Sequence, residues 1–266
     1  MHKFRLALLM LAALLCASAK AEITRDVVYG HKDGMALVMD IYRPEANNNG
    51  AGVAFMVSGG FTSSLEMQTM MEVAFVPLVE AGFTVFAVRH GSFPQYKMAD
   101  AYADVSKGLQ FIGANAGSYG VDPQRVGIFG GSAGGLLALL AGLADTGANG
   151  EDPTFRVKAV VAYYPPTHEL LSLGIQPFYP EDLSLLPGLT PINHISANDP
   201  PVLLVHGDSD DLVPIEQSEA MYAALQNSGV TTDFVAMAGS GHGFRGEAAD
   251  EANKLLIDWF SKYLLY

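Results

Sequence analysis

Gly130-Gly131-Ser132-Ala133-Gly134 lies between a short apolar run, residues 126–129, and a leucine-rich run with the spacing of a helix. This order predicts a buried strand, a sharp turn and a helix. The turn fits the pattern G-x-S-x-G, in which the serine has a strained backbone and small neighbours let the strand and the helix approach closely. The stretch therefore predicts that Ser132 stands exposed above the end of a sheet, although a glycine-rich turn holding an ordinary serine has the same pattern.

Strand-like and helix-like segments alternate along the rest of the chain. Apolar runs typical of buried strands lie at residues 52–57, 83–88, 126–129, 157–164, 201–206 and 232–237. Helices are expected at residues 66–80, 98–112 and 216–227, after Ser132, and around residues 255–263. This alternation predicts the α/β class, with a doubly wound, mostly parallel sheet and helices on both faces. Ligands of such sheets bind beyond the carboxyl ends of the strands.

Two segments fall outside this alternation. Residues 23–29 and 35–42 are strand-like and meet at Lys32-Asp33-Gly34, which predicts a hairpin. Asp40 in the second of these strands is expected to be structural. Residues 167–198 are irregular and contain several prolines, and their apolar content favours an ordered cover rather than a separate lid domain.

The first residues differ in kind from the rest of the chain. Basic residues precede an apolar run at residues 6–15, and small residues at 17–21 offer a cleavage site. This pattern predicts a secretory signal peptide, because the apolar run is too short to span a bilayer. We therefore expect residues 1–21 to be removed and residues 22–266 to form a single catalytic domain. The mature protein would be exported to the periplasm or secreted, with no membrane attachment.

The composition argues against several classes of partner and chemistry. The chain carries 15 basic and 28 acidic residues, a formal net charge of −13, which disfavours nucleic acid and anionic membranes as partners. Cys16 is the only cysteine. Because it lies in the predicted signal peptide, the mature protein would have no disulfide, no thiolate chemistry and no cysteine-ligated metal.

Three predicted strand ends carry residues that suit nucleophilic catalysis. Asp208, Asp210 and Asp211 follow the strand at 201–206, and His242 lies among glycines after the strand at 232–237. A carboxylate can orient an imidazole, and flexible neighbours let that imidazole reach a serine on another strand. Acidic residues also cap turns, and a loop histidine is often only solvated. The order nucleophile, acid, base nevertheless matches hydrolases of this fold class, which favours Ser132, Asp210 and His242 as a triad.

Acyl transfer also needs backbone N–H donors for the oxygen that becomes negative, each lowering the barrier by about 3 kcal/mol. The amide of Ala133, the residue after the nucleophile, is one candidate. Gly59, Gly60 or Phe61 after the strand at 52–57 could supply the others, because missing side chains allow close approach. The same glycines also fit a plain tight turn.

Further side chains are candidates for contact with a substrate. The aromatic residues expected near the pocket, although such residues more often belong to the core, are Phe61, Phe93, Tyr164, Phe178 and Tyr179. The other histidines are expected to serve turns, packing or substrate contacts: His31, His90, His168, His194 and His206.

Five motifs, taken in order, resemble the α/β-hydrolase superfamily: MDIYRP, SGG, GVDPQRVGIFGGSAGG, DPPVLLVHGDSDDLVP and GSGHGF. Within the superfamily the chain is similar to the carbohydrate-esterase-like and feruloyl-esterase-like group called BD-FAE, near the catalytic domains of prolyl oligopeptidase relatives. The resemblance extends from about Asp40 to the C-terminus. It implies the α/β-hydrolase fold, a triad of Ser132, Asp210 and His242, and an oxyanion site around Gly60, Phe61 and Ala133.

The chain departs from the family pattern at one motif. The family commonly has His-Gly-Gly-x-Trp where this chain has Ser58-Gly59-Gly60-Phe61-Thr62. The side-chain support of this loop must therefore differ from that of the family.

These observations lead to one hypothesis and two alternatives. The hypothesis is a serine carboxylester hydrolase that acts on small or carbohydrate-linked esters through an acyl-enzyme and needs neither a metal nor an organic cofactor. One alternative is an exported aminopeptidase or amidase on the same triad, which the missing propeller domain of peptidase relatives disfavours. The other is a binding protein that keeps the fold without turnover, which a His242 turned away from Ser132 would favour.

Overall fold

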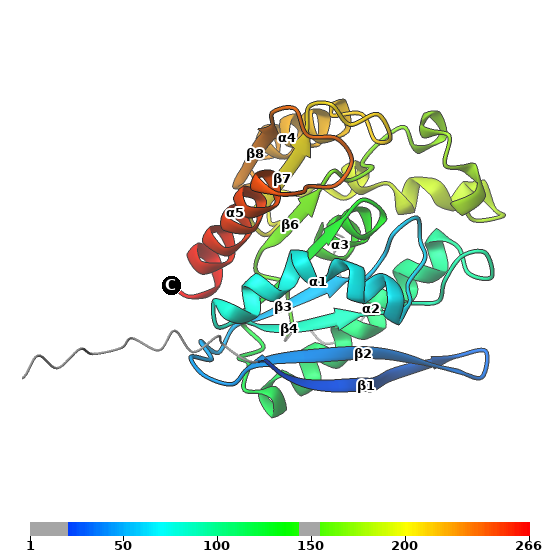
Figure 1. Ribbon diagram of the computed structural model, residues 1–266. Helices are drawn as coiled ribbons and strands as arrows, with labels where there is room; N and C mark the ends of the chain where they lie inside the picture. Colours follow the sequence, from blue (N-terminus) through cyan, green and yellow to red (C-terminus); the bar gives the residue numbers. More distant parts are fainter. Residues whose placement is uncertain (1–20, 144–154) are drawn as a thin grey trace, which may run out of the picture.

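Eight strands form one sheet in the computed structural model, which describes residues 21–143 and 155–266 (Figure 1). The strand order is β1-β2-β4-β3-β5-β6-β7-β8. Strand β2 pairs antiparallel with β1 and β4, and the other neighbours are parallel. The bounds are Ala21–Lys32 for β1, Met35–Pro44 for β2, Gly52–Met56 for β3, Thr84–Val88 for β4, Val126–Gly131 for β5, Val160–Tyr163 for β6, Val202–Gly207 for β7 and Thr232–Met237 for β8. The predicted doubly wound, mostly parallel sheet is confirmed.

The predicted signal peptide is not tested by the structure, because residues 1–20 lie outside the described part of the chain. The first described residue, Ala21, begins β1 and pairs with Pro44. The limits of the mature chain and its single-domain organisation therefore stay predictions.

The central strands are short and apolar because both of their faces are covered. Every residue of β3, β4, β6 and β7 is buried. A strand with both faces in the core has no polar face, so its sequence is a continuous apolar run rather than an alternation. This is why the sequence located these strands to within a few residues.

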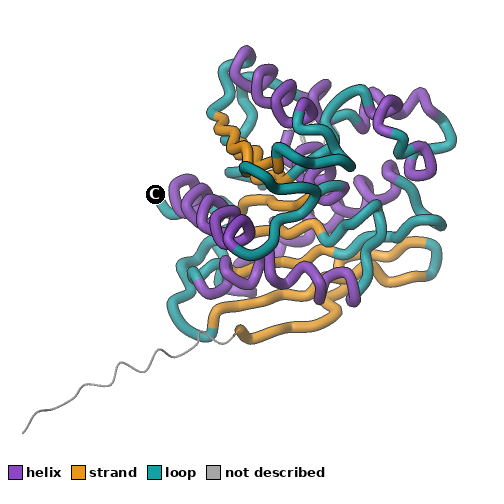
Figure 2. Tube along the Cα trace, turned by 45° about the horizontal axis from the view of Figure 1, so that its top comes forward, coloured by secondary structure: helices purple, strands orange, loops and turns teal. Residues whose placement is uncertain are grey.

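Helices cover both faces of the sheet, as the sequence predicted (Figure 2). Helices α1 and α5 pack on one face, where they bury Phe75, Leu78, Leu256 and Phe260. Helices α2, α3 and α4 pack on the other face. The bounds are Leu65–Glu80 for α1, Met98–Asn115 for α2, Ala133–Leu143 for α3, Glu216–Asn227 for α4 and Glu247–Leu264 for α5, and a short 3-10 helix, η1, spans Ala116–Tyr119.

The predicted hairpin forms the edge of the sheet. Its turn contains Asp33 with φ 48° and Gly34 with φ 78°, two left-handed residues of the kind that join twisted strands tightly. Both strands extend beyond the predicted ranges, because backbone pairing continues from Lys32 and Met35 at the turn to Ala21 and Pro44 at the far end. The apolar pattern alone did not show these polar extensions.

Asp40 is fully buried in β2 and is structural, as predicted. Its carboxylate accepts hydrogen bonds from Arg25 at 2.7 Å, from Gln68 at 2.8 Å and from Arg89 at 2.9 Å, and from the amide of Asp26 at 2.8 Å. Burial alone would raise the pKa of Asp40, but these donors together hold that pKa below its ordinary value. The network ties β1, β2, β4 and α1 together.

The irregular stretch between β6 and β7 is an ordered cover. It contains four 3-10 helices: η2 at Leu170–Leu173, η3 at Gln176–Phe178, η4 at Leu183–Leu189 and η5 at Pro191–His194. Leu170, Tyr179, Leu186 and Leu189 are buried in the same apolar cluster as α3. The segment therefore shares the core of the domain and forms no lid domain of its own, in agreement with the prediction.

The described residues contain neither a membrane-spanning helix nor a cluster of metal ligands. No helix in residues 21–143 or 155–266 is long and apolar enough to cross a membrane. Within the same ranges, no three His, Cys, Asp or Glu side chains are grouped in a way that could hold a metal ion.

Candidate active site

Ser132 lies at the junction of β5 and α3, with the strained backbone that the sequence predicted. Its φ is 55°, a left-handed value that is rare for a residue other than glycine. The junction is too tight for side chains. A Cβ at Gly130 would lie 2.2 Å from the carbonyl oxygen of Gly134, and a Cβ at Gly134 would lie 2.6 Å from that of Met56. The glycines therefore allow the turn that raises Ser132 above the carboxyl end of the sheet.

His242 links Ser132 to Asp210. Its Nε2 lies 2.9 Å from Oγ of Ser132, and its Nδ1 lies 2.7 Å from Oδ2 of Asp210. The side chain of His242 is 21% exposed and that of Asp210 is fully buried. The structure thus brings together three residues that follow three different strands, β5, β7 and β8, in one hydrogen-bonded line.

Asp210 is held firmly by its own loop. Its Oδ1 accepts hydrogen bonds from the amides of Leu212 and Val213, each at 2.9 Å, which leaves Oδ2 for His242. The other two acidic candidates, Asp208 and Asp211, lie on the surface of the same loop. Asp208 is exposed and accepts a hydrogen bond from the amide of Gly239, and Asp211 is exposed. The geometry therefore selects Asp210 from the three acids.

His206, one of the histidines expected to serve turns, packing or substrate contacts, supports the turn that holds Asp210. It is fully buried at the end of β7, with Nε2 2.8 Å from the carbonyl oxygen of Val213 and Nδ1 2.7 Å from Oγ of Ser218. Burial lowers the pKa of His206. A neutral ring must donate from Nε2 to the carbonyl oxygen and accept at Nδ1 from the hydroxyl. This ring fixes Val213 in the turn that holds Asp210, and its Nε2 also lies 3.4 Å from Oδ2 of Asp210.

The loop after β3 is a tight two-residue turn. The amide of Gly59 donates to the carbonyl oxygen of Thr62 and the amide of Thr62 donates to that of Gly59, each at 3.0 Å. Gly60 and Phe61 between them have φ 53° and 54°, as in a type I′ turn. The amide of Gly59 is therefore already occupied, which corrects its inclusion among the predicted oxyanion donors. The amides of Gly60, Phe61 and Ala133 remain the candidates.

The imidazole of His90 is hydrogen-bonded to Ser58, the residue just before this turn. Nε2 of His90 is 2.9 Å from Oγ of Ser58, and Nδ1 is 2.8 Å from the carbonyl oxygen of Gly91. The carbonyl oxygen can only accept, so Nδ1 carries the proton and Nε2 accepts from the hydroxyl of Ser58. Burial lowers the pKa of His90 to about 4, which keeps the ring neutral. The sequence did not show this pair, because neither residue belongs to a motif that marks it for a partner, unlike the residues of the triad.

Two of the predicted pocket aromatics lie against the turn. The ring of Phe178 is 5.5 Å from that of Phe61 and 4.9 Å from that of Phe93, measured between centroids. A Cβ at Gly60 would lie 3.4 Å from Phe178, so this ring covers the turn. Tyr179 differs from the prediction. It is buried, and its hydroxyl donates to the carbonyl oxygen of Leu170, so it anchors the cover and does not line a pocket.

Tyr164 packs against the catalytic histidine candidate. The centroid of its ring lies 4.7 Å from that of His242. Its φ is 38°, a second strained residue beside Ser132. Burial and the nearby Asp210 raise the pKa of Tyr164 to about 12, so the phenol stays neutral over the ordinary pH range. Tyr164 therefore bounds the site on the side of His242.

Fold and site together define an α/β-hydrolase. The sheet is mostly parallel, a serine stands at a strained turn between β5 and α3, and the acid and the histidine follow β7 and β8. A family model, BD-FAE, matches residues 39–225. The chain belongs to this family, as its motifs predicted.

The chain is similar in sequence and in fold to proteins named as esterases. The chain is 28% identical over 265 residues to esterase LipQ of Mycobacterium tuberculosis, covering 91% of this chain and 62% of LipQ. It covers between 51% and 62% of the length of the first curated relatives that it matches. Among solved structures, esterase 2 of Thermogutta terrifontis phosphorylated by paraoxon is 26% identical with a TM-score of 0.74, covering 92% of this chain and 95% of that one. A truncated carbohydrate esterase from gut microbiota is 23% identical with a TM-score of 0.76, covering 92% and 97%, a likeness of fold.

Proposed function

We propose that the protein is a serine esterase that hydrolyses small carboxylic esters. The observation that carries this proposal is the position of His242, which is hydrogen-bonded at once to Ser132 and to Asp210. A base within hydrogen-bonding reach of a nucleophile, oriented by a third group, is the arrangement that activates a serine.

The hydrogen bonds assign the protons of His242. Oδ1 of Asp210 already accepts two backbone N–H groups, and Oδ2 accepts from Nδ1 of His242. Nε2 is then the unprotonated nitrogen and accepts the hydroxyl proton of Ser132. In the proposed first step, Oγ of Ser132 attacks the ester carbonyl while Nε2 takes its proton, and Asp210 stabilises the imidazolium that forms.

The oxygen of the tetrahedral intermediate needs donors that are not already bonded. We assign this role to the amide of Ala133, at the positive N-terminus of α3, and to the amides of Gly60 and Phe61 in the turn after β3. The turn is supported by the hydrogen bond between Ser58 and His90 and by the ring of Phe178, which packs on Phe61. Preorganised donors of this kind stabilise developing charge without having to rearrange.

The remaining steps return the enzyme to its starting state. The protonated His242 gives its proton to the leaving alcohol, which produces an acyl-enzyme on Ser132. Water, deprotonated by the same imidazole, then releases the acid. The similarity to an esterase that is phosphorylated by paraoxon supports a nucleophilic mechanism, because such reagents modify activated nucleophiles.

The substrate is further defined by the alcohol from which the ester is formed. The proposal covers small esters and esters linked to carbohydrate. Similarity to a carbohydrate esterase supports the second kind through the fold alone. The names of LipQ and of esterase 2 support ester hydrolysis without specifying the alcohol.

The alternatives make different demands on the site. A binding protein without turnover does not require the imidazole to face the serine, whereas the distance from Nε2 of His242 to Oγ of Ser132 is 2.9 Å. An aminopeptidase would use the same triad, so the two activities must be distinguished by the substrates that the protein cleaves.

We also propose that the protein is exported, on the basis of the predicted signal peptide. Fractionation of the cells that express it tests this proposal.

Hydrolysis of p-nitrophenyl acetate and of alanine p-nitroanilide by the purified protein tests the function. We expect the ester to be cleaved and the anilide to be cleaved at least about a hundredfold more slowly, because an amide carbonyl is less reactive than an ester carbonyl and an esterase has no site that compensates for the poorer leaving group. Faster cleavage of the anilide would contradict esterase activity and support the peptidase.

A further inference from the structure

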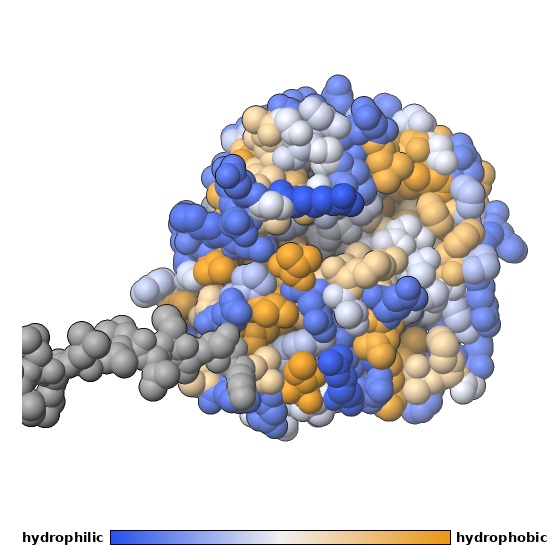
Figure 3. Space-filling view, viewed as in Figure 1, coloured by the Kyte–Doolittle hydropathy of each residue, from blue (hydrophilic) through white to orange (hydrophobic). Residues whose placement is uncertain are grey.

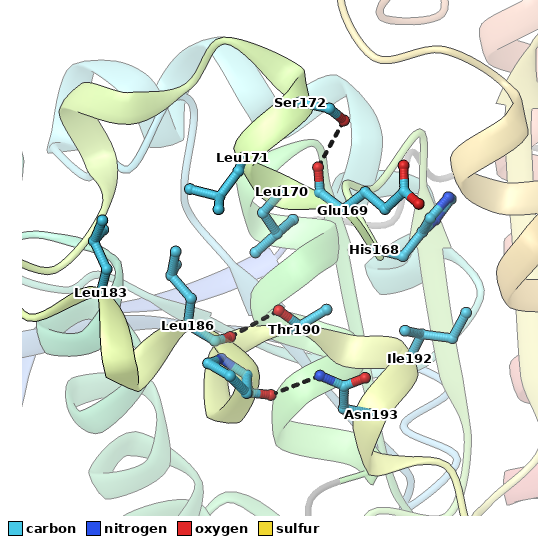
Figure 4. A pocket seen from close by; sticks show the side chains of 11 residues that line it. His168, Glu169, Leu170, Leu171, Ser172, Leu183, Leu186, Thr190, Ile192 and Asn193 are labelled. Carbon is cyan, nitrogen blue, oxygen red and sulfur yellow. Dashed lines mark hydrogen bonds between the residues drawn. The ribbon is translucent and has the colours of Figure 1, made fainter.

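A cavity of about 710 Å³ lies within the cover, outside the line of Ser132, His242 and Asp210 (Figure 4). Its volume falls in the range of sites for small molecules, about 300 to 1,000 Å³. The residues that line it come from two arms of the cover: His168, Glu169, Leu170, Leu171, Ser172, Leu183, Leu186, Pro187, Thr190, Ile192 and Asn193.

The interior of this cavity is apolar. Figure 4 shows the side chains of Leu170, Leu171, Leu183 and Leu186 turned toward the hollow between the two arms. Leu171 is 58% exposed and Leu183 is 53% exposed. These two large side chains contribute little to the core, and hydrophobic surface gathers over this part of the molecule at the upper right of Figure 3. An exposed apolar patch beside a hollow is typical of a binding site.

Three polar side chains of the lining donate their hydrogen bonds within the cover, whereas His168 and the exposed Glu169 lie at the rim. The hydroxyl of Ser172 donates to the carbonyl oxygen of Glu169 at 2.7 Å, and that of Thr190 donates to the carbonyl oxygen of Leu186 at 2.7 Å. The side-chain amide of Asn193 donates to the carbonyl oxygen of Pro187 at 3.0 Å. A sugar would lose its bonds to water on entering and would find these donors engaged, which is costly. An aliphatic chain needs no such partners.

The floor of the cavity packs on the core that also supports the oxyanion site. Leu170 and Leu186 on its floor belong to the same apolar cluster as Phe61 and Ala133 of the oxyanion site, and Ile192 packs on that cluster. The amide of Ile192 donates to the carbonyl oxygen of Thr167 at 3.1 Å, next to the cavity residue His168.

The short segment between Tyr164 and His168 limits the distance between His242 and the rim of the cavity. Tyr164 packs on His242, and only four residue steps separate it from His168 at the rim. Four residues span at most about 14 Å. The rim residue His168 therefore lies within about 14 Å, Cα to Cα, of the residue that packs on His242.

We propose that this cavity receives an aliphatic chain of the ester substrate, so that the enzyme prefers esters with a medium or long alkyl group over acetates and over sugar esters. This proposal rests on the proposed esterase function. The alkyl group can belong to the acid or to the alcohol, and the chemistry recognised is the same. Each buried CH₂ group should raise kcat/KM about fourfold while it enters the cavity.

Two series of esters test the proposal. In the first, p-nitrophenyl esters extend from acetate to decanoate, and in the second, acetates extend from ethanol to decanol. We expect kcat/KM to rise with length in one series, which identifies the side that enters the cavity. No rise in either series, with acetate hydrolysed, would overturn the proposal and leave the esterase function standing.

Variants connect any such preference to the cavity. Leu171→Asp and Leu183→Asp place a charge at its exposed rim and should reduce the ratio of kcat/KM for the longest ester to that for acetate at least about tenfold, because a charge resists burial. Met70→Asp is the matched control, since Met70 is 61% exposed on α1 and does not line the cavity. This control should keep both the ratio and the acetate activity. A preference for long chains that survives in both cavity variants would contradict the proposal.

Binding of decanol, measured by calorimetry, tests the cavity without any catalysis. We expect saturable binding to the full-length protein that Leu171→Asp weakens and Met70→Asp does not. Absence of saturable binding would overturn the cavity proposal. Failure of the esterase function would instead appear as no hydrolysis of any ester, with decanol still bound.

Discussion

Ser58 donates a hydrogen bond from its hydroxyl to Nε2 of His90 at 2.9 Å, directly behind the turn that carries the candidate oxyanion donors. The family commonly has a histidine in the chain position of Ser58. In this protein the imidazole comes from the end of the neighbouring strand, β4, and a small hydroxyl takes its place in the loop. The loop thus keeps a polar support although its motif has changed.

Loss of the Ser58 hydroxyl should destabilise the protein and loosen this turn. Ser58→Ala leaves Nε2 of His90 buried without a partner, at a cost of about 1 to 3 kcal/mol in the free energy of unfolding. We expect kcat to fall more than KM changes, because the donors act on the transition state. Urea unfolding and steady-state kinetics measure the two effects. Ser106→Ala, which removes a part-buried hydroxyl on α2, is the control, and equal effects of both substitutions would contradict the role of Ser58.

His90 should make the stability depend on pH. Its pKa in the folded protein is about 4, below the ordinary 6.5, because burial opposes the charge more than the nearby Asp104 favours it, and Lys32 adds to the lowering. As the pH falls from 6.5 toward 4, the unfolded chain binds a proton that the folded protein does not. The free energy of unfolding should therefore fall, by up to about 3 kcal/mol.

Urea unfolding between pH 7 and pH 4 tests this dependence. His90→Gln should lose this part of the slope. Asp40, with a pKa held below 3.8, destabilises the fold in the same direction but only at lower pH. An identical slope in the wild type and in His90→Gln would show that His90 is not the group responsible.

The sequence predicted the parts of the site that depend on local pattern. The G-x-S-x-G turn, the acid after one strand and the histidine after another were located because each motif adjoins an apolar strand, and parallel strands bring their carboxyl ends to one edge. Buried strands such as β7 have the plainest pattern, and the alternation of strands and helices determines the class of fold.

Pairs outside these motifs could not be predicted in this way. Ser58 and His90 belong to no motif that pairs them, and the same holds for His206 and Ser218, which meet only after the sheet and α4 have packed. The sequence also offered Tyr179 as a candidate for the pocket, whereas packing turns its hydroxyl to the backbone of the cover. Whether an aromatic ring lies in a core or in a pocket depends on contacts that periodicity does not contain.

Asp210→Asn should reduce kcat far more than a change at either neighbouring acid. An amide can offer Nδ2 to Nδ1 of His242 and so favour the wrong tautomer, which costs about four orders of magnitude in enzymes with this triad. Asp211→Asn, at an exposed position in the same turn, is the matched control. Steady-state hydrolysis of p-nitrophenyl acetate provides the measurement. A loss of less than tenfold in Asp210→Asn would argue against the assignment of Asp210.

Gly130→Ala should disrupt the turn at Ser132. The new Cβ would lie 2.2 Å from the carbonyl oxygen of Gly134, which the backbone cannot easily relieve. We expect a loss of at least about 2 kcal/mol in the free energy of unfolding, together with a loss of activity. Gly117→Ala is the control, because nothing lies within 4 Å of a Cβ there. Thermal unfolding that is equal for both variants would show that the turn is less tight than the structure indicates.

Covalent labelling of Ser132 tests the central claim most directly. A fluorophosphonate reacts with a serine only when a neighbouring base and oxyanion donors activate it. The purified protein is treated with the reagent, digested, and analysed by mass spectrometry for the modified residue. We predict stoichiometric modification of Ser132, parallel loss of ester hydrolysis, and no labelling in His242→Ala. An unlabelled Ser132 in a folded protein, or full esterase activity in Ser132→Ala, would contradict the account.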